Sequence, residues 1–329
     1  DEYRKRIKEA LENRESLEAH RVKFNSLRLK FPVEYANIQN ATNSTGDFLH
    51  HATNVRNTFE CYEIENLGDC YRAFRFKDCY RVNNTINSVG VESGMVHNSS
   101  NCLGDLFCQD SMNVAYSYTC NDCMDVFGSS GLMKKKNCIL NKQYSEEEYK
   151  KLRVQIVADM KVRGEWGEFL PSKFCPHAYN DSQAMYTLPL TKDEALKRGY
   201  RWQDEASGTR GKKTIAIEAV PNMIQETTDS ITKEILACQR CGLNYRVNPI
   251  ELKLLRSLNL AVPLTCPECR FEARFKLHNK PMLYDRECMC DKPHSDHAGG
   301  RCSNKFKTTY APNRPEIVYC GKCYQEEII

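Results

Sequence analysis

The chain has 329 residues, of which 41% are hydrophobic and 27% are charged, as in a folded protein of two or three domains. No apolar run approaches the roughly 18 residues that a membrane-spanning helix needs, so we expect no membrane association. The formal net charge of +4 counts every thiol as neutral, and two zinc sites of four thiolates each would cancel it, which makes this mild basicity weak evidence for nucleic acid.

Cysteine is unusually frequent, with 18 in the chain. Nine of these cysteines follow Ala237, and six of the nine form three C-x-x-C pairs. This grouping favours metal binding over disulfide bonds, and it predicts a reducing, cytoplasmic compartment.

The first 30 residues predict an amphipathic helix, because Tyr3, Ile7, Leu17 and Phe24 fall roughly on one stripe among charged residues. We expect residues 1–40 to form a cap over the first coil of the repeat that follows, since an open solenoid end exposes unpaired strand edges. A helix that binds a partner is the alternative. The charged N-terminus is followed by no apolar signal segment.

A cysteine-rich repeat occupies residues 41–142, and its clearest part divides into the segments ATNVRNTFE, CYEIENLGD, CYRAFRFKD and CYRVNNTIN. Small or apolar residues recur in phase every nine residues, and the frame returns later with Cys102, Cys120 and Cys138. A fixed short period indicates stacked units that bury their apolar side chains against their neighbours. We therefore predict an α+β protein with a parallel β-solenoid of nine-residue strand-and-corner units, capped by helices, in which two units make an 18-residue coil and these three cysteines stack.

Each Cys-Tyr pair of this repeat should point its cysteine inward and its tyrosine outward, because successive strand residues face opposite sides. Asn, Asp and Gly between the strands suit repeated tight corners. The cysteines then act as small hydrophobic residues in a narrow core, and a metal-binding or redox ladder is the alternative.

Residues 143–230 are predicted to form a capping helix and a mixed connector. The helix is expected to start at Ser145, which can form a capping box with Glu148, and to end at Gly164. It is the natural second cap of the solenoid. The sequence places no histidine-and-acid pair at a recognisable spacing from Cys175, so this cysteine gives no evidence for a catalytic thiol.

Residues 231–329 are predicted to form tandem zinc modules that resemble a treble clef or a zinc ribbon. In the first module, Cys238 and Cys241 form a knuckle, and Cys266 and Cys269 open a helix. Two C-x-x-C pairs at this separation can hold one tetrahedral zinc ion, with disulfides as the alternative. Four thiolates leave no open position for water, so we expect structural zinc and no catalysis.

The second module is less regular than the first. Cys320 and Cys323 form its C-x-x-C pair, and the partners of this pair come from Cys288, Cys290 and Cys302. The spacing alone leaves the choice between Cys288 and Cys290 open.

An insert in the second module contains two histidines, His294 and His297. Together with the cysteine that the second site leaves over, they could hold another metal ion, and the alternative is a polar loop. The cofactor prediction is therefore two zinc ions, or three if Cys290, His294 and His297 bind one.

A basic stripe with interleaved aromatic residues follows the second C-x-x-C pair. Phe271 and Phe275 lie among its cations, which are Arg270, Arg274, Lys276 and Lys280, with His278 beside them. This pattern favours a nucleic-acid-binding face. The alternative is an amphipathic helix whose phenylalanines pack on the zinc module while its charges are solvated.

Three parts of the chain carry specific motifs: residues 235–291 with the first four zinc cysteines, residues 308–328, and the segment KNCILNKQYSEEEY at the end of the repeat. They resemble the uncharacterised zinc-ribbon-domain proteins of bacteria of the candidate phyla radiation. That family commonly has further zinc motifs upstream, so we expect the chain to be a fragment or a short member. The resemblance implies an architecture and no activity.

The resemblance also selects ligands for the second module. Aligned on the segment TTYAP at residues 308–312, the family's two cysteines fall on Cys288 and Cys302. The resemblance therefore implies Cys288, Cys302, Cys320 and Cys323 as the quartet.

We expect a non-enzymatic zinc-binding scaffold that presents a rigid solenoid face and zinc modules to a protein or RNA partner. An RNA-binding zinc protein is the alternative, and its binding would weaken steeply with salt. An enzyme would need an acid, a base or an open metal position that the sequence does not show, and no small-molecule substrate is evident.

Overall fold

The computed structural model describes residues 2–81, 83–86, 90–91, 96–175, 177–204, 208–294, 297 and 300–328. The chain forms two compact units, each built from two separate segments. Unit 1 contains Asp1–Pro32 and His177–His278, and unit 2 contains Val33–Pro176 and Asn279–Ile329. This division differs from the four consecutive domains that we predicted, because the two cysteine modules belong to different units.

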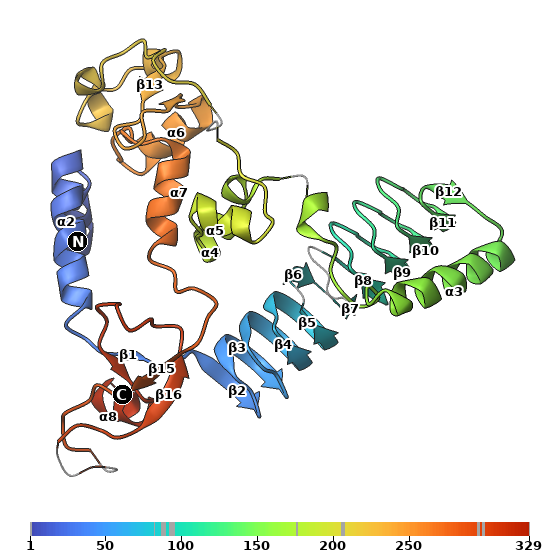
Figure 1. The fold of residues 1–329 in the computed structure, drawn as a ribbon. Coiled ribbons are helices and arrows are strands. Elements are labelled where there is room, and N and C mark those ends of the chain that lie inside the picture. The colour runs from blue at the N-terminus through green and yellow to red at the C-terminus, as the bar shows by residue number, and fades with distance from the viewer. Residues whose placement is uncertain are drawn as a thin grey trace. The chain divides into compact units, whose positions relative to one another are not determined.

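Unit 2 contains the predicted parallel β-solenoid, which confirms the fold class (Figure 1). Its strands are β2 (Ile38–Thr42), β3 (Gly46–Thr53), β4 (Thr58–Gly68), β5 (Tyr71–Tyr80), β6 (Asn83–Ile86), β7 (Gly90–Val91), β8 (Cys102–Leu103), β9 (Met112–Ala115), β10 (Met124–Phe127), β11 (Lys136–Ile139) and β12 (Lys142–Gln143). Each strand from β2 to β11 pairs in parallel with its neighbours, and β12 turns back to pair antiparallel with β11.

The coil of this solenoid is 12 residues long. Leu49 of β3 pairs with Cys61 of β4, and Val114 of β9 pairs with Val126 of β10, which pairs with Cys138 of β11. The prediction of nine-residue units in an 18-residue coil is therefore wrong. Cys102 and Cys120 do not stack on each other, because 18 residues correspond to one and a half coils.

The underlying repeat has three residues, which explains why a nine-residue frame matched the sequence. A positive φ recurs at every third residue from Phe48 to Arg81 and again from Asn98 to Leu140. The residue after most of these bends points inward where its side chain is described, as Leu49, Ala52 and Val55 do, each fully buried. Lys135 and Asn141, near the end of the solenoid, are exposed instead. Nine and 12 are both multiples of three, so the frame found the inward positions and missed the coil length.

The left-handed bends account for the corner composition. Most residues avoid positive φ, whereas glycine adopts it freely and Asn and Asp tolerate it. Asn, Asp and Gly occupy more than half of these positions. Their side chains also form ladders between coils, such as Asn43 to Asn54 to Asn66 to Asp78, with Nδ2 to Oδ1 distances of 3.0, 3.3 and 2.7 Å.

Four inward columns fill the core of the coils, and small polar side chains in them join one coil to the next. Ser111 Oγ donates to the carbonyl of Gln109 at 2.8 Å and accepts from the backbone N–H of Cys123, one coil later, at 3.0 Å. Cys61 Sγ does the same, with the carbonyl of Phe59 at 3.1 Å and the N–H of Ala73 at 3.2 Å. The described cysteines of the repeat therefore point inward as predicted, whereas the side chain of Cys79 lies outside the described residues. These cysteines also serve as weak hydrogen-bonding groups.

Helix α3 (Glu146–Val162) covers one side of the last coils rather than their end. It begins at the predicted capping box of Ser145 and Glu148. Its apolar stripe, which contains Tyr149, packs on a row of outward residues that supplies one side chain per coil: Leu103, Ala115, Phe127 and Ile139. Figure 1 shows this helix beside β8–β11. The end of the solenoid is instead closed by the antiparallel strand β12.

Unit 2 also contains the second cysteine module. Its elements are β1 (Val33–Glu34), β15 (Tyr284–Glu287), β16 (Lys305–Thr308), β17 (Val318–Tyr319) and α8 (Gly321–Ile328), with β1 parallel to β17 and β15 antiparallel to β16. A single 3₁₀ turn, Ser172–Phe174, follows α3.

Unit 1 contains the N-terminal helices and the first cysteine module. Its elements are α1 (Glu2–Ala10), α2 (Arg14–Arg28), α4 (Ala184–Thr187), α5 (Lys192–Lys197), β13 (Leu236–Ala237), β14 (Asn244–Tyr245), α6 (Pro249–Ser257) and α7 (Pro267–Phe275), with short 3₁₀ turns at Tyr179–Asp181, Ile217–Ala219, Ile224–Glu226 and Asp229–Thr232. The segment that we expected to cap the solenoid thus belongs to the unit of the first cysteine module. Among the described residues, no helix is long and apolar enough to cross a membrane.

A buried carboxyl group lies in one inward column of the solenoid. Asp105 accepts hydrogen bonds from the N–H groups of Ser117, one coil later, at 2.8 Å and of Leu103 at 3.1 Å. Burial raises its pKa to about 8, because the charged carboxylate loses its hydration. A raised pKa in the folded state favours folding at low pH, and this contribution is lost as the pH rises from about 4 through 8.

We predict that Asp105→Ser flattens this pH dependence. Serine can still accept from Ser117 N–H, as Ser117 Oγ accepts from Ser129 N–H at 3.2 Å. In urea unfolding of the wild-type protein, the contribution of Asp105 to the free energy of unfolding should be about 2–3 kcal/mol smaller at pH 8.5 than at pH 6. The variant should not show this decrease. The exposed Asp110→Ser is the control and should keep the wild-type slope; equal slopes in all three proteins would contradict the assignment.

Candidate metal centres

The first cluster contains the four cysteines Cys238, Cys241, Cys266 and Cys269, whose sulfur atoms all lie within 4.8 Å of one another. Cys238 and Cys241 lie in the hairpin of β13 and β14, where the N–H of Gly242 donates to the carbonyl of Cys238 at 2.9 Å. Gly242 has a φ of +74°, which suits glycine. The hairpin thus places its two thiols against the pair that opens α7.

The start of α7 favours negative charge on this cluster. Cys266 is the N-cap of the helix, and its sulfur accepts from the N–H of Cys269 at 3.4 Å. Although burial opposes ionisation, backbone hydrogen bonds from Cys266, Cys241 and Arg240 lower the pKa of Cys238 to about 6. A thiolate next to free helical N–H groups is prepared to bind a cation.

An apolar core supports the first cluster. Helix α6 begins at the predicted N-cap, Asn248, which accepts from the N–H of Glu251 at 2.8 Å. Its buried Leu252 and Leu255 pack in the same cluster as the metal-binding cysteines. Arg14, which opens α2, donates to the carbonyl of Val262 at 3.0 Å. The N-terminal helix is therefore fastened to the first cysteine module.

The second cluster contains Cys288, Cys302, Cys320 and Cys323, whose sulfur atoms also lie within 4.8 Å of one another. This is the quartet that the resemblance selected, and it places Cys288 rather than Cys290 in the four-thiol group. All four are buried. Cys288 Sγ accepts from the N–H of Cys320 at 3.2 Å, and Asn304 donates to Cys320 Sγ at 3.4 Å.

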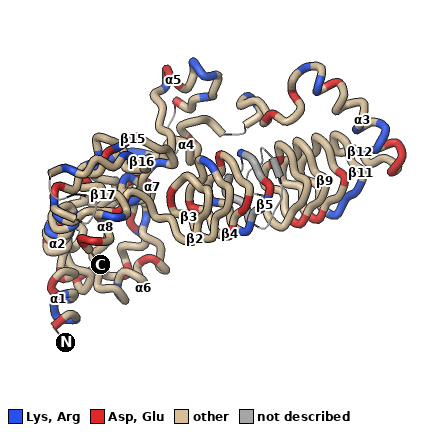
Figure 2. Tube along the Cα trace, turned by 90° about the horizontal axis from the view of Figure 1, so that it is seen from below, with Lys and Arg blue, Asp and Glu red and all other residues tan. Residues whose placement is uncertain are grey.

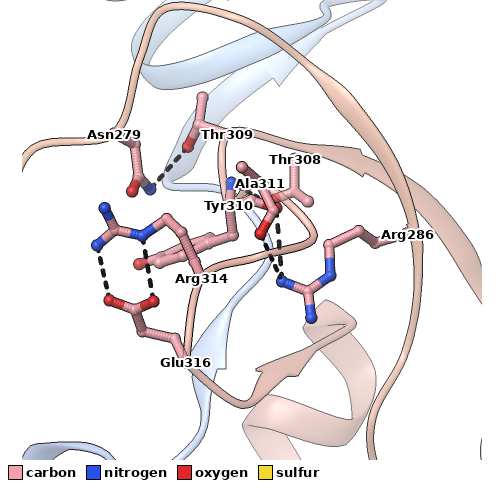
Figure 3. A network of polar contacts seen from close by, with 8 residues as sticks. All are labelled: Asn279, Arg286, Thr308, Thr309, Tyr310, Ala311, Arg314 and Glu316. Carbon is pink, nitrogen blue, oxygen red and sulfur yellow. Dashed lines mark hydrogen bonds and ion pairs between the residues drawn. The ribbon is translucent and has the colours of Figure 1, made fainter.

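A polar network holds the loop between β16 and β17 (Figure 3). Arg286 donates to the carbonyls of Tyr310 and Ala311 at 3.5 and 3.4 Å. Arg314 forms a two-bond ion pair with the buried Glu316 at 3.1 and 2.7 Å. The TTYAP segment forms the first part of this loop, which connects the strand after Cys302 to the strand before the Cys320 pair.

The second module is joined to the first coil of the solenoid. Val33 N–H donates to the carbonyl of Ile317 at 2.8 Å, and Thr308 Oγ1 donates to the carbonyl of Tyr35 at 2.6 Å. Asp47, which is buried in β3, accepts from the N–H of Asn37 at 2.8 Å and bonds Thr309 Oγ1. The second cysteine module and the start of the solenoid therefore share one hydrogen-bond network.

A third group contains Cys290, His297 and Cys323, so it shares Cys323 with the second cluster. His294, which we predicted as a ligand, lies beside it, with its ring centroid 5.4 Å from that of His297. The structure thus groups all of the predicted metal-ligating residues except His294. It arranges them in three groups, and the donor atoms of His294 fall outside these groups.

The predicted basic face is partly neutralised by ion pairs. Arg270 pairs with Glu251 of α6 at 2.7 Å and is mostly buried, which makes it a link between α6 and α7. Phe271 and Phe275 pack against Tyr186 of α4, with ring centroids 4.9 and 5.6 Å away. The phenylalanines are therefore packed, as the alternative interpretation expected, but on Tyr186 of α4, which lies outside the predicted zinc module. Arg274 and the C-cap residue Lys276 are exposed at the end of α7, and Lys280, which belongs to unit 2, is exposed as well.

Comparison with known proteins adds no function. No protein-family model and no curated protein matches the chain. Among solved structures, a candidate acetyltransferase of Bacillus cereus is similar at 9% identity and a TM-score of 0.12, over 38% of this chain and 91% of that one. A similarity this low carries no argument about fold or activity.

We predict that the two modules stabilise different parts of the chain. Cys302→Ser should lower the zinc content and accelerate amide hydrogen exchange in residues 33–53, because the second module shares hydrogen bonds with the first coil. Cys241→Ser should lower the zinc content while residues 33–53 exchange as in the wild-type protein. Hydrogen-exchange mass spectrometry measures both. Equal exchange of residues 33–53 in the two variants would contradict the prediction.

Proposed function

We propose that the protein is a non-enzymatic, zinc-binding scaffold that presents one outer face of the solenoid to a protein partner. The observation that carries the proposal is a row of exposed, stacked aromatic rings. Tyr62 and Phe74 lie one coil apart, with centroids 5.2 Å apart and ring planes 11° apart, and 37% and 39% of their surfaces are exposed. His50 extends the row, 5.6 Å from Tyr62.

The face around this row is rigid, which favours recognition. Ion pairs between coils flank the rings: Arg72 with Glu60 at 2.7 Å, and Arg75 with Glu63 at 2.8 Å. The Arg75 guanidinium also lies 5.2 Å from the centroid of the Phe74 ring. Because neighbouring coils hold these side chains in place, a partner would bind them with little further loss of conformational entropy.

The composition of the face favours protein over nucleic acid. Tyr and Arg are enriched at the energetic centres of protein interfaces. Each cation beside the rings has an anion one coil away, and Lys77 with Glu65 at 3.1 Å continues the pattern. Figure 2 shows both signs of charge on the coils of β3–β5. A phosphate backbone would require an excess of positive charge.

We propose zinc as the metal of the two quartets and treble-clef-like folding for the first module. Four thiolates whose sulfur atoms lie close enough to surround one ion tetrahedrally suit zinc. A cysteine pair in a hairpin, followed by a cysteine pair at the start of a helix, supports the treble-clef assignment. The relation to the zinc-ribbon-domain proteins and a cytoplasmic location, where thiolates stay reduced, belong to the same proposal.

RNA binding through the surface of α7 is the second candidate. The exposed Arg274 and Lys276 support it, whereas the ion pair of Arg270 with Glu251 and the packing of Phe271 on Tyr186 weaken it. No catalytic constellation accompanies either candidate among the residues that the structure describes outside the metal groups.

We predict that Tyr62→Ala with Phe74→Ala weakens binding to the native partner at least tenfold, because hot-spot aromatics carry much of the binding free energy. The partner is first isolated from the source cells by cross-linking to the wild-type chain and identified by mass spectrometry. Affinity is then measured by calorimetry at 50 and 300 mM salt, and it should change little between the two.

The matched control is Phe107→Ala, which removes another exposed aromatic side chain from a different part of the solenoid. It should bind the partner as the wild-type protein does. Replacing Arg274 and Lys276 by Ala should also leave binding unchanged. A complex that survives the aromatic double variant but weakens steeply with salt and in the basic double variant would overturn the scaffold proposal in favour of RNA binding.

A further inference from the structure

Cys323 belongs to two potential ligand sets at once. Its sulfur lies within 4.8 Å of the other three thiols of the second cluster, and also within 4.8 Å of Cys290 Sγ and a ring nitrogen of His297. His297 Nε2 is 3.4 Å from Cys323 Sγ. The first turn of α8 therefore places one thiol between two groups of donors.

The second group has the features of a metal site. Cys290 is fully buried, yet the quartet does not include it. Buried nitrogens of two rings, His294 Nε2 and His297 Nδ1, have no hydrogen-bond partner within the described residues. A buried polar nitrogen without a partner is costly, and a bound cation would remove that cost at His294 Nε2. His297 faces Cys323 with Nε2, so its own case as a ligand rests on that contact and not on Nδ1.

His294 is oriented in the manner of a ligand. Its Nδ1 lies 3.2 Å from a carboxylate oxygen of Glu326 in α8, and its side chain is only 7% exposed. A histidine that binds a metal through one nitrogen commonly donates the other N–H to a carboxylate, which fixes the ring and raises its basicity. The contact with Glu326 occupies Nδ1 of His294 and leaves the buried Nε2, which has no hydrogen-bond partner among the described residues, as the nitrogen available to a metal.

Electrostatics favours a second cation beside the quartet. One zinc ion with four thiolates keeps two negative charges in a buried cluster. Adding a second divalent ion, the Cys290 thiolate and neutral histidines reduces this excess to one negative charge. A thiolate has more than one lone pair, so Cys323 can bind both ions at the same time.

We propose that the second module holds a binuclear zinc centre in which Cys323 bridges the two ions. Cys288, Cys302 and Cys320 complete the first site. Cys290 and His297 hold the second ion together with Cys323, and a shift of His294, whose donor nitrogens lie outside this group, would supply the fourth ligand, with Glu326 positioning the ring. The chain therefore binds three zinc ions, one in the first module and two in the second.

Metal counting by native mass spectrometry of the full chain, loaded with zinc and then desalted, tests the stoichiometry. The wild-type protein should carry three ions, and Cys290→Ser and His297→Gln should carry two each. Cys323→Ser should carry only one, because the bridge belongs to both sites. The ion of the first module is the internal control and should remain in every variant. Two ions in the wild-type protein would overturn the proposal.

Cadmium substitution tests the bridge itself. With ¹¹³Cd in place of zinc, the two resonances of the second module should show scalar coupling to each other through the shared sulfur, and Cys290→Ser should abolish that coupling. Glu326→Gln should keep three ions and weaken the ion that His294 binds in a chelator competition. Three ions without cadmium–cadmium coupling would contradict a bridging Cys323 even though the count agrees.

Discussion

The solenoid depends on one constraint: every third residue bends into the left-handed region, and the residue after it must be small enough to fit inside a 12-residue coil. Four inward side chains per coil leave little room, which accounts for Ala, Val, Ser and Cys at these positions. The polar ones do more than fill space, because Ser111 and Cys61 each accept a backbone N–H from the next coil. A buried N–H without an acceptor would cost about 1–3 kcal/mol.

Because each coil fixes the register of the next, side chains on the outside also align in rows. The rows of Asn and Asp pair with each other, and the rows of Glu face rows of Arg and Lys. The same alignment stacks Tyr62 on Phe74. At the first coil, Asp47 accepts a hydrogen bond from Thr309 Oγ1, which connects the aligned coils to the second cysteine module. The proposed recognition face and the metal centre thus rest on one rigid framework.

The sequence allowed much of this to be predicted. Stacked parallel coils follow from in-phase small residues, the start of α3 follows from Ser145 and Glu148, and the pairing of Cys238 and Cys241 with Cys266 and Cys269 follows from their spacing.

The coil length could not be predicted in the same way, because any multiple of three keeps small residues in phase. The place of the N-terminal helix depends on Arg14 bonding Val262, a contact between residues 248 positions apart that no local pattern reveals. The sequence did not show that the positive charge of Arg270 is neutralised, because its ion-pair partner, Glu251, lies on another helix. Asp105 lies in phase with apolar inward residues, and this could have marked it as buried.

The most direct test of this account is the stability of two variants of Ser111, measured by urea unfolding of the zinc-loaded protein. If inward side chains join the coils by accepting the N–H of the next one, Ser111→Cys should remain close to the wild-type stability, because thiols already fill this role at other inward positions. Ser111→Ala should lose about 1–3 kcal/mol, because the N–H of Cys123 loses its acceptor. Equal losses in the two variants, or no loss in either, would show that the inward columns act through their size alone.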